Sequence, residues 1–494
     1  MLIKSAWLCD DAYITFRTVD NFINGYGLRW NIAERVQTYT HPFWMFLISI
    51  FYFFTKEAFY TSLLISITLT LFTLYILLFK ISGNSLTSVF ILIPILLSKS
   101  FLDFSTSGLE NPLSHFLLVI FSLEYLRGEN LKNRKLILGF LTALILLNRM
   151  DFIFILITLI IPEIYKNSKK DIISFSIGFI PFVVWELFSL WYYGFPFPNT
   201  AYAKLSTGIP RLVLIKEGLY YFKESFLLDP VTLVVIFVSL LILIIKKNKK
   251  LFPIGLGIIF YLGYIVFIGG DFMAGRFLTA PFVLSLVILS FIDFRRVLVK
   301  ISIIILFLIT GLISLNNTIQ SFKPWEQDTL SNTLTVVDER RFYYSDSNLW
   351  DTFKGIHMPK HNWVDLGRKI QRDKIKYLLT NNIGFQGYYA GPECFLLDKF
   401  GLSDPLLSKL PTQKGWRIGH YPRNIPDGYM ESIVSNKILI EDKDLNFYYK
   451  KLLILTREDL FDSDRLVEII KFNLGSYQHL LGNYITRTKN YLNK

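Results

Sequence analysis

Residues 127–171 read RGENLKNRKLILGFLTALILLNRMDFIFILITLIIPEIYKNSKKD, and this stretch decides the fold. Two apolar runs, 136–147 and 152–165, are joined by the four-residue hairpin NRMD and flanked by loops rich in Lys and Arg. Basic loops of membrane proteins stay on the cytoplasmic side, so the hairpin between the runs faces the opposite side. The stretch therefore predicts two antiparallel helices that cross a bilayer.

The composition extends this interpretation to the whole chain. The 494 residues are 52% hydrophobic and only 18% charged, whereas about a quarter of the residues in soluble domains are charged. The Lys and Arg residues behind the net charge of +13 fall in short blocks between apolar runs. This arrangement is typical of membrane loops. We therefore expect the lipid bilayer, and no nucleic acid, among the partners of this protein.

Apolar runs bounded by charges or turn residues predict ten helices and an α-helical polytopic membrane protein. The ranges are 59–79, 86–98, 112–126, 136–147, 152–165, 172–193, 231–245, 251–268, 280–292 and 301–315. Several are shorter than the ~20 residues that cross a bilayer, so we expect them to extend into their flanks. Residues 42–55, PFWMFLISIFYFFT, favour an interfacial helix, with a short span as the alternative.

Charge alternates between two sets of loops. The set 80–85, 127–135, 166–171, 246–250 and 293–300 has 15 Lys and Arg in 34 residues, against 12 in the 123 residues of 1–58, 99–111, 148–151, 194–230 and 269–279. The basic set marks the cytoplasm, so the other loops and the tail face outward from a bacterial inner (plasma) membrane. Ten spans then leave Met1 outside. This predicts one more helix upstream of Met1, with translocation of a short tail as the alternative.

The composition becomes polar from Asn316 onward. We predict a multispanning catalytic domain over 1–315 and a periplasmic soluble α/β domain over 316–494, which is long enough for its own core. Strand-like runs between Gly and Pro turns are YYSDS (343–347), IKYLLTNN (375–382), CFLLD (394–398), ILIED (438–442) and NFYYKKLLIL (446–455). The two cysteines, Cys9 and Cys394, are too few for a disulfide framework, and one bridge between them requires both to lie outside the cell.

The outward loops concentrate acidic, basic and amide side chains. The candidates are Asp10, Asp11, Arg17, Arg35, His41, Glu110, Arg149, Asn199, Lys204, Asp271 and Arg276, and His420 follows in the tail. For each one alone, a solvated loop charge or an interfacial anchor is the alternative. Together they suit group transfer from a membrane-anchored phosphate. Arg and Lys stabilise phosphate charge, and a carboxylate takes the proton from an acceptor hydroxyl.

Other chemistries lack their motifs in this sequence. There is no GxxxxGK[ST] loop for ATP chemistry, no HExxH pattern for zinc, and no G-x-S-x-G elbow for a serine hydrolase. The motifs that are present, in chain order, are DDAYITFR, GYGLRWN, YTHPFW, SGLENPL, PFPNTAYAK and GGDFM, then GYYAGPECFLLDKFGLSDPLLSKLP and GHYPRNIPDGY.

These motifs resemble the GT-C membrane glycosyltransferases, especially the mycobacterial terminal β-(1→2) arabinofuranosyltransferase group, over most of the chain from Ala6 to about Tyr429. Relatives elsewhere are also labelled flagellar motor-control proteins. The resemblance implies a polyprenyl-phosphate sugar donor, with arabinofuranose as the implied sugar. It also implies a periplasmic cell-envelope glycan or glycosylated component as acceptor. Family members have a helix before the DD motif, and this chain has only nine residues there.

In GT-C enzymes an aspartate of the first outward loop is the catalytic acid–base. By resemblance this role falls to Asp10 or Asp11, without deciding between them. The other carboxylate is expected to pair with a cation such as Arg17 or Arg35, or to help bind a divalent cation. The alternative is that both aspartates only cap the helix that starts near Ala12.

Charge and position make Arg149, Lys204 and Arg276 the candidates for phosphate contact. His41 is a candidate for a hydrogen bond to substrate, or an interfacial polar anchor. His420 is a candidate for acceptor binding, or part of a loop that packs on the membrane domain. Two competing functions are a flippase or transporter of lipid-linked sugars and a non-catalytic envelope scaffold. A transporter would need ionisable residues at mid-membrane and repeated halves. The predicted spans are nearly free of charge inside, and no internal repeat is visible.

Overall fold

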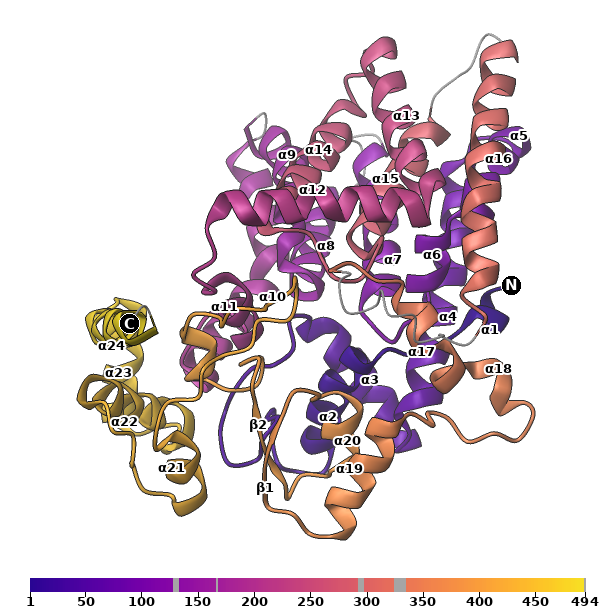
Figure 1. The fold of residues 1–494 in the computed structure, drawn as a ribbon. Helices are drawn as coiled ribbons and strands as arrows, with labels where there is room; N and C mark the ends of the chain where they lie inside the picture. Colours follow the sequence, from indigo (N-terminus) through magenta and orange to yellow (C-terminus); the bar gives the residue numbers. More distant parts are fainter. Residues whose placement is uncertain (128–132, 166–167, 292–296, 324–334, 493–494) are drawn as a thin grey trace.

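The computed structural model describes residues 1–127, 133–165, 168–291, 297–323 and 335–492. Most of these residues are helical. In Figure 1 the long helices form the upper body. Below them lie α2 (Asp10–Ile23), α3 (Pro42–Thr55) and the C-terminal segment, which is the described chain from residue 335 onward. The described residues do not include residue 292, the last of the predicted helix 280–292. They also lack residues 128–132, 166–167 and 293–296 of the basic loops, which contribute to the charge count.

The elements up to residue 320 are helices. They are α1 (Leu2–Ser5), α2 (Asp10–Ile23), α3 (Pro42–Thr55), α4 (Ala58–Tyr75), η1 (Ile76–Ile81), α5 (Ser85–Leu97), α6 (Lys99–Phe104), α7 (Asn111–Leu126), α8 (Arg134–Asn148), η2 (Met150–Phe152), α9 (Ile153–Tyr165), α10 (Lys169–Tyr193), α11 (Asn199–Leu205), α12 (Arg211–Leu228), α13 (Pro230–Lys246), α14 (Phe252–Ile268), η3 (Arg276–Leu278), α15 (Thr279–Ser290) and α16 (Val297–Gln320).

Helices occupy all ten ranges predicted from the apolar runs, as far as these ranges are described, and α3 has the bounds expected of the interfacial helix. In the described part of the chain, three helices are long and apolar enough to cross a membrane: Ala58–Ile81, Lys169–Tyr193 and Leu298–Gln320. The pair α12 and α13 also qualifies when taken together, but is bent by 110°. These features agree with a helical membrane protein. Ten complete spans and their sidedness stay predictions.

The sequence did not predict α12, which lies in a range taken for a loop. In Figure 1 α12 runs across the long helices. The bend that follows it falls at Asp229 and Pro230, because proline lacks the N–H that would continue the helix. Oδ2 of Asp229 accepts hydrogen bonds from the backbone N–H of Ser100 at 2.7 Å and from Oγ1 of Thr232 at 2.6 Å. The bend is therefore anchored on α6.

Glycines allow α8 and α10 to pack closely. A Cβ atom on Gly139 would lie 2.1 Å from the carbonyl oxygen of Phe175, and one on Gly178 would lie 2.2 Å from that of Leu136. Small residues at such crossings are typical of helices that associate within a membrane. The two helices therefore lie in direct backbone contact, and Arg149 follows the end of α8.

The elements after residue 335 combine helices with one small sheet. They are α17 (Glu339–Ser347), α18 (Leu349–Thr352), α19 (Asn362–Arg372), β1 (Tyr377–Thr380), α20 (Phe385–Tyr389), β2 (Phe395–Asp398), η4 (Leu407–Lys409), α21 (Tyr429–Ser435), α22 (Lys443–Arg457), α23 (Ser463–Asn473) and α24 (Gln478–Leu492). Strands β1 and β2 are parallel, with Tyr377 opposite Phe395 and Thr380 opposite Asp398.

Two of the five predicted strand runs contain these strands, and the other three predictions are wrong. Residues 343–347 belong to α17, 446–455 belong to α22, and 438–442 contain no strand. In α22 the buried residues recur with helical spacing, which a short apolar run hides; they are Leu445, Tyr448, Tyr449, Leu452 and Leu455. The α/β character of the tail and its boundary at residue 315 stay predictions.

The C-terminal segment packs directly on α2. Gly384 lies against the first turn of α2, since a Cβ atom there would be 2.0 Å from the carbonyl oxygen of Asp10. The backbone N–H of Phe385, at the start of α20, donates to Oδ1 of Asp10 at 2.7 Å. This contact brings residues more than 370 positions apart to one place.

Candidate active site

Glu110 is the centre of a buried cluster of charged side chains. It precedes α7, where a carboxylate is favoured by the helix dipole. Its Oε1 lies 3.0 Å from Nη1 of Arg149 and 3.1 Å from Nη2 of Arg276. Burial raises the pKa of Glu110. The nearby Arg276, His41 and Arg149 outweigh this effect and hold the pKa below its ordinary value. The group is therefore ionised.

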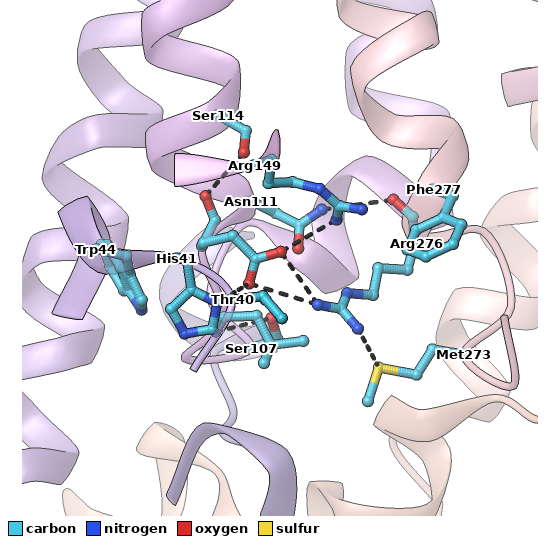
Figure 2. Close-up of polar contacts among 12 residues, drawn as sticks. Thr40, His41, Trp44, Ser107, Asn111, Ser114, Arg149, Met273, Arg276 and Phe277 are labelled. Atoms are coloured by element: carbon cyan, nitrogen blue, oxygen red, sulfur yellow. Dashed lines mark hydrogen bonds and ion pairs between the residues drawn. The ribbon is translucent and has the colours of Figure 1, made fainter. Parts of the chain in front are cut away.

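His41 completes this cluster from a third direction. Figure 2 shows His41, Arg149 and Arg276 pointing toward one another from separate elements. Nδ1 of His41 lies 3.4 Å from Oε2 of Glu110, and Nε2 lies 2.8 Å from Oγ1 of Thr15. Burial lowers the pKa of His41 to about 4, so its ring is neutral at pH 7. His41 therefore orients Glu110 without adding a charge.

Each arginine of the cluster also pairs with a second carboxylate. Nε of Arg149 donates to Oδ1 of Asp151 at 3.0 Å, and Nη1 of Arg276 lies 3.5 Å from Oδ2 of Asp271. Nε of Arg276 is buried and has no hydrogen-bond partner among the described residues. Arg276 is therefore held by two carboxylates and keeps one enclosed donor unpaired.

A cavity of about 430 Å³ opens beside this cluster. Its polar wall includes Glu110, Arg149, Lys204, Asp271 and Arg276. Its other walls are apolar and aromatic; they include Ile153, Phe154, Phe197, Leu205, Tyr264 and Phe277. Several of these apolar side chains are partly exposed on the outside of the protein. The cavity thus suits a ligand with a charged head and an apolar tail.

A second, polar cleft of about 900 Å³ lies next to the first cavity. Asp10 and Asp11 line it, together with groups from the C-terminal segment; these include Glu339, Tyr343, His361, Trp363, Asn381, Asn382, Lys399, Arg417 and His420. Lys204 and Gly419 line both spaces. The two spaces therefore meet at Lys204.

The two aspartates have different surroundings. Asp10 is 7% exposed and accepts the N–H of Phe385, and burial raises its pKa to about 7. Asp11 is partly exposed to the cleft and has no hydrogen bond or ion pair with the residues that the structure describes. Burial raises the pKa of Asp11, while the charges of Lys204 and Arg276 oppose this. The carboxylate of Asp11 is thus close enough to Lys204 and Arg276, and to Asp271 and Glu110, for their charges to act on it.

Three of the predicted binding residues tie distant segments together. Arg17 is 2% exposed, donates to the carbonyl oxygens of Trp30, Gly387 and Cys394, and stacks on the Trp30 ring. Arg35 donates to Leu455 and Glu458, which follow in the C-terminal segment. Nδ2 of Asn199 donates to the carbonyls of 401, 402 and 404. None of the three lies with Asp10 and Asp11 in the polar cleft, and the expected pairing of an aspartate with Arg17 or Arg35 is absent from the described contacts.

His420 lies in the polar cleft, with its ring 4.6 Å from that of Phe272 and 5.4 Å from that of Phe400. Burial lowers its pKa to about 3, so it is neutral at pH 7. Sequence analysis missed Glu339, His361 and Trp363, because nothing in their local sequence distinguishes them from solvated residues.

The described residues contain no group of three or more His, Cys, Asp or Glu side chains placed to hold a metal ion. The divalent cation stays a prediction. Cys9 and Cys394 are both buried and free, so the structure has no bridge between them.

Comparison with curated proteins gives a relative named terminal beta-(1->2)-arabinofuranosyltransferase, from Mycobacterium tuberculosis (strain ATCC 25618 / H37Rv). The two are 24% identical over 531 aligned positions, which cover 85% of this chain and 81% of the relative. The chain is a distant relative of a glycosyltransferase. No family model and no solved structure matches it. The relationship supports glycosyltransferase activity at a coarse level, consistent with the predicted activity and with the apolar helices of a membrane protein.

Proposed function

We propose that the protein is a membrane glycosyltransferase of the GT-C type. It transfers a sugar from a polyprenyl-phosphate donor to a cell-envelope glycan on the outer side of the inner membrane. The observation that carries this proposal is the position of Lys204, which lines both the cavity with apolar walls and the polar cleft that contains Asp11. A donor phosphate and an acceptor hydroxyl could therefore reach the same point from two sides.

The first cavity is suited to the donor. Lys204 has no ion pair or hydrogen bond with the described residues, and Nε of Arg276 lacks a partner. Arg149 is already held by Glu110 and Asp151, so its role is to fix Glu110. Lys204 and Arg276 would hold the phosphate and stabilise the charge that grows on it as the bond to the sugar breaks. The apolar walls would receive the first isoprene units.

The second cleft is suited to the acceptor glycan. Its lining combines carboxylates and amides with the rings of Trp363, Phe342 and Phe400, a combination that binds sugar hydroxyls and sugar faces. We assign proton transfer from the acceptor hydroxyl to Asp11, because its carboxylate lines the polar cleft beside Lys204 and has no hydrogen bond or ion pair with the described residues. Asp10 would fix the contact between α2 and α20.

The outward orientation is supported by the arrangement of charge. The end of α13 at Lys246 and the start of α16 lie at the top of the body in Figure 1, whereas α2 and α17 to α20 lie at the bottom. Basic residues at one end, opposite the proposed catalytic residues, agree with a site at the periplasmic face. Arabinofuranose is the sugar to test first, because the relative is named for its transfer.

The test is transfer by the purified protein in lipid nanodiscs. Synthetic polyprenyl-phosphate arabinofuranose and an arabinose oligosaccharide are supplied, other polyprenyl-phosphate sugars are tried in parallel, and products are identified by mass spectrometry. We expect the wild type to extend the acceptor by one sugar. Asp11→Asn should lower the rate by about 100-fold or more, while Asp10→Asn, which can still accept the N–H of Phe385, should remain active.

Two outcomes contradict the proposal. One is the absence of product with every donor sugar, together with movement of unchanged donor across the membrane of sealed proteoliposomes, which would indicate a flippase. Binding of neither donor nor acceptor would indicate a scaffold. Full activity of Asp11→Asn would reject the assignment of Asp11 alone.

A further inference from the structure

Glu339 is a buried carboxyl group that faces the polar cleft without a partner. Its side chain is 8% exposed, and it lines the same cleft as Asp10 and Asp11. No residue in the described ranges donates a hydrogen bond to it or forms an ion pair with it. Because Glu339 lines the cleft and no protein group occupies its carboxyl oxygens, a ligand bound in the cleft can form hydrogen bonds with them.

The chain holds Glu339 in place on both sides. Just before it, the N–H of Val337 donates to the carbonyl of Phe272 at 2.8 Å, and Asp338 pairs with Lys99 at 3.0 Å. Just after it, Nε of Arg340 lies 2.9 Å from Oδ1 of Asp103. These three contacts join the start of α17 to the loop before η3 and to α6. The backbone that carries Glu339 is therefore held at the wall of the cleft.

The charge around Glu339 determines which form of the carboxyl group is present. Burial, and then the neighbouring charge of Asp11, raise the pKa of Glu339 well above its ordinary value. The protonated form has one O–H donor and acceptor oxygens. A sugar hydroxyl also both donates and accepts, so the two groups match.

We propose that Glu339 binds the acceptor sugar by hydrogen bonds to a hydroxyl beside the one that Asp11 deprotonates. Glu339 thereby sets the position of the acceptor in the cleft, and the inference rests on the function proposed above. The donor is held by Lys204 and Arg276 in the other cavity, which Glu339 does not line. Loss of the Glu339 side chain should therefore affect the acceptor and leave donor binding unchanged.

The experiment measures initial rates in nanodiscs with the acceptor and the donor varied separately. We expect Glu339→Ala to raise the KM for the acceptor about tenfold, the size of one or two lost hydrogen bonds, with the donor KM within about twofold of wild type. Glu339→Gln keeps a donor and an acceptor, so it should restore most of the affinity. Glu393→Ala, which changes an exposed glutamate of the same segment, is the matched control.

Two further points make the outcome decisive. If Glu339→Ala melts early, Glu339→Met replaces it, because methionine fills a similar volume without strong hydrogen bonds. An unchanged acceptor KM in Glu339→Ala and Glu339→Met, or equal increases in the donor and acceptor KM, would overturn the role of Glu339. Sugar transfer by the wild type in the same assay would still uphold the proposed function. A wild type that transfers no sugar would remove both proposals.

Discussion

Glu110 accepts a 3.1 Å hydrogen bond from Nη2 of Arg276, which lies 166 positions later in the chain. Glu110 also pairs with Arg149 and contacts His41, so one carboxylate joins the ends of three separate segments. A buried charge that loses its partner is strongly destabilising. The cluster is therefore expected to hold the donor cavity together as well as to line it.

Replacing Glu110 with glutamine should destabilise the fold, because Arg149 and Arg276 lose a shared counter-charge. Asp151 and Asp271 still pair with the two arginines, so the expected loss is about 2–3 kcal/mol, below the range for a buried charge left with no partner. Thermal unfolding in detergent, followed by circular dichroism, measures it against Glu393→Gln, which alters an exposed glutamate. Equal melting temperatures for the two variants would refute this prediction.

The stability of the protein should depend on the pH through Asp10. Burial raises the pKa of Asp10 to about 7, above the ordinary value of about 3.9. The folded state then keeps a proton that the unfolded chain has lost. The stabilisation is complete below about pH 4 and is lost as the pH rises through about 7. Asp10→Asn is neutral throughout, so its melting temperature relative to wild type should rise from pH 4 to pH 8. A constant difference would contradict this.

Lys204 should contribute to donor affinity and little to stability, because it is exposed and makes no ion pair with the described residues. Lys204→Met should raise the donor KM about tenfold or more, the loss expected for one charge-assisted hydrogen bond. The melting temperature should stay within a degree or two. Lys204→Arg keeps the charge and should retain most of the affinity. A donor KM that is unchanged in Lys204→Met would place the phosphate elsewhere.

Arg17, in contrast to Lys204, should contribute to the stability of the fold and little to donor affinity. Arg17→Ala removes the hydrogen bonds to the carbonyl oxygens of Gly387 and Cys394, removes one of the two donors to the carbonyl of Trp30, and removes the contact with the Trp30 ring. The expected loss of stability is about 2–4 kcal/mol, measured as a lower melting temperature. The KM values of the molecules that remain folded should be those of wild type. Normal stability combined with a raised donor KM would instead restore Arg17 as a binding residue.

The sequence predicted the helices better than it predicted the roles of polar residues. Apolar runs are local, so the positions of the ten helices could be found without knowing the tertiary structure. Arg17 and Asn199 appeared to be binding residues because polar groups in an apolar chain are unusual. Their partners, the carbonyls of residues 387 and 401, are known only once the chain has folded.

The same limit explains what was missed. Glu339 lies in the charged stretch DERR, which in the sequence has the pattern of a solvated surface. Its place at the wall of the cleft depends on the contacts of Val337 and Asp338 with distant segments, which the sequence does not reveal. The choice between Asp10 and Asp11 was open for a related reason. The contact that distinguishes the two aspartates comes from the N–H of Phe385, 375 positions away, which donates to Asp10, and the catalytic role of either aspartate stays a prediction.

The position of Lys204 at the junction of the two cavities has a consequence for timing. Its positive charge opposes the rise in the pKa of Asp11, so it weakens that carboxylate as a base. A phosphate bound beside Lys204 would cancel this effect and make Asp11 more basic. The protein would then be ready to activate an incoming hydroxyl only after the lipid carrier has arrived, which imposes an order on the two substrates and reduces wasteful reaction with water.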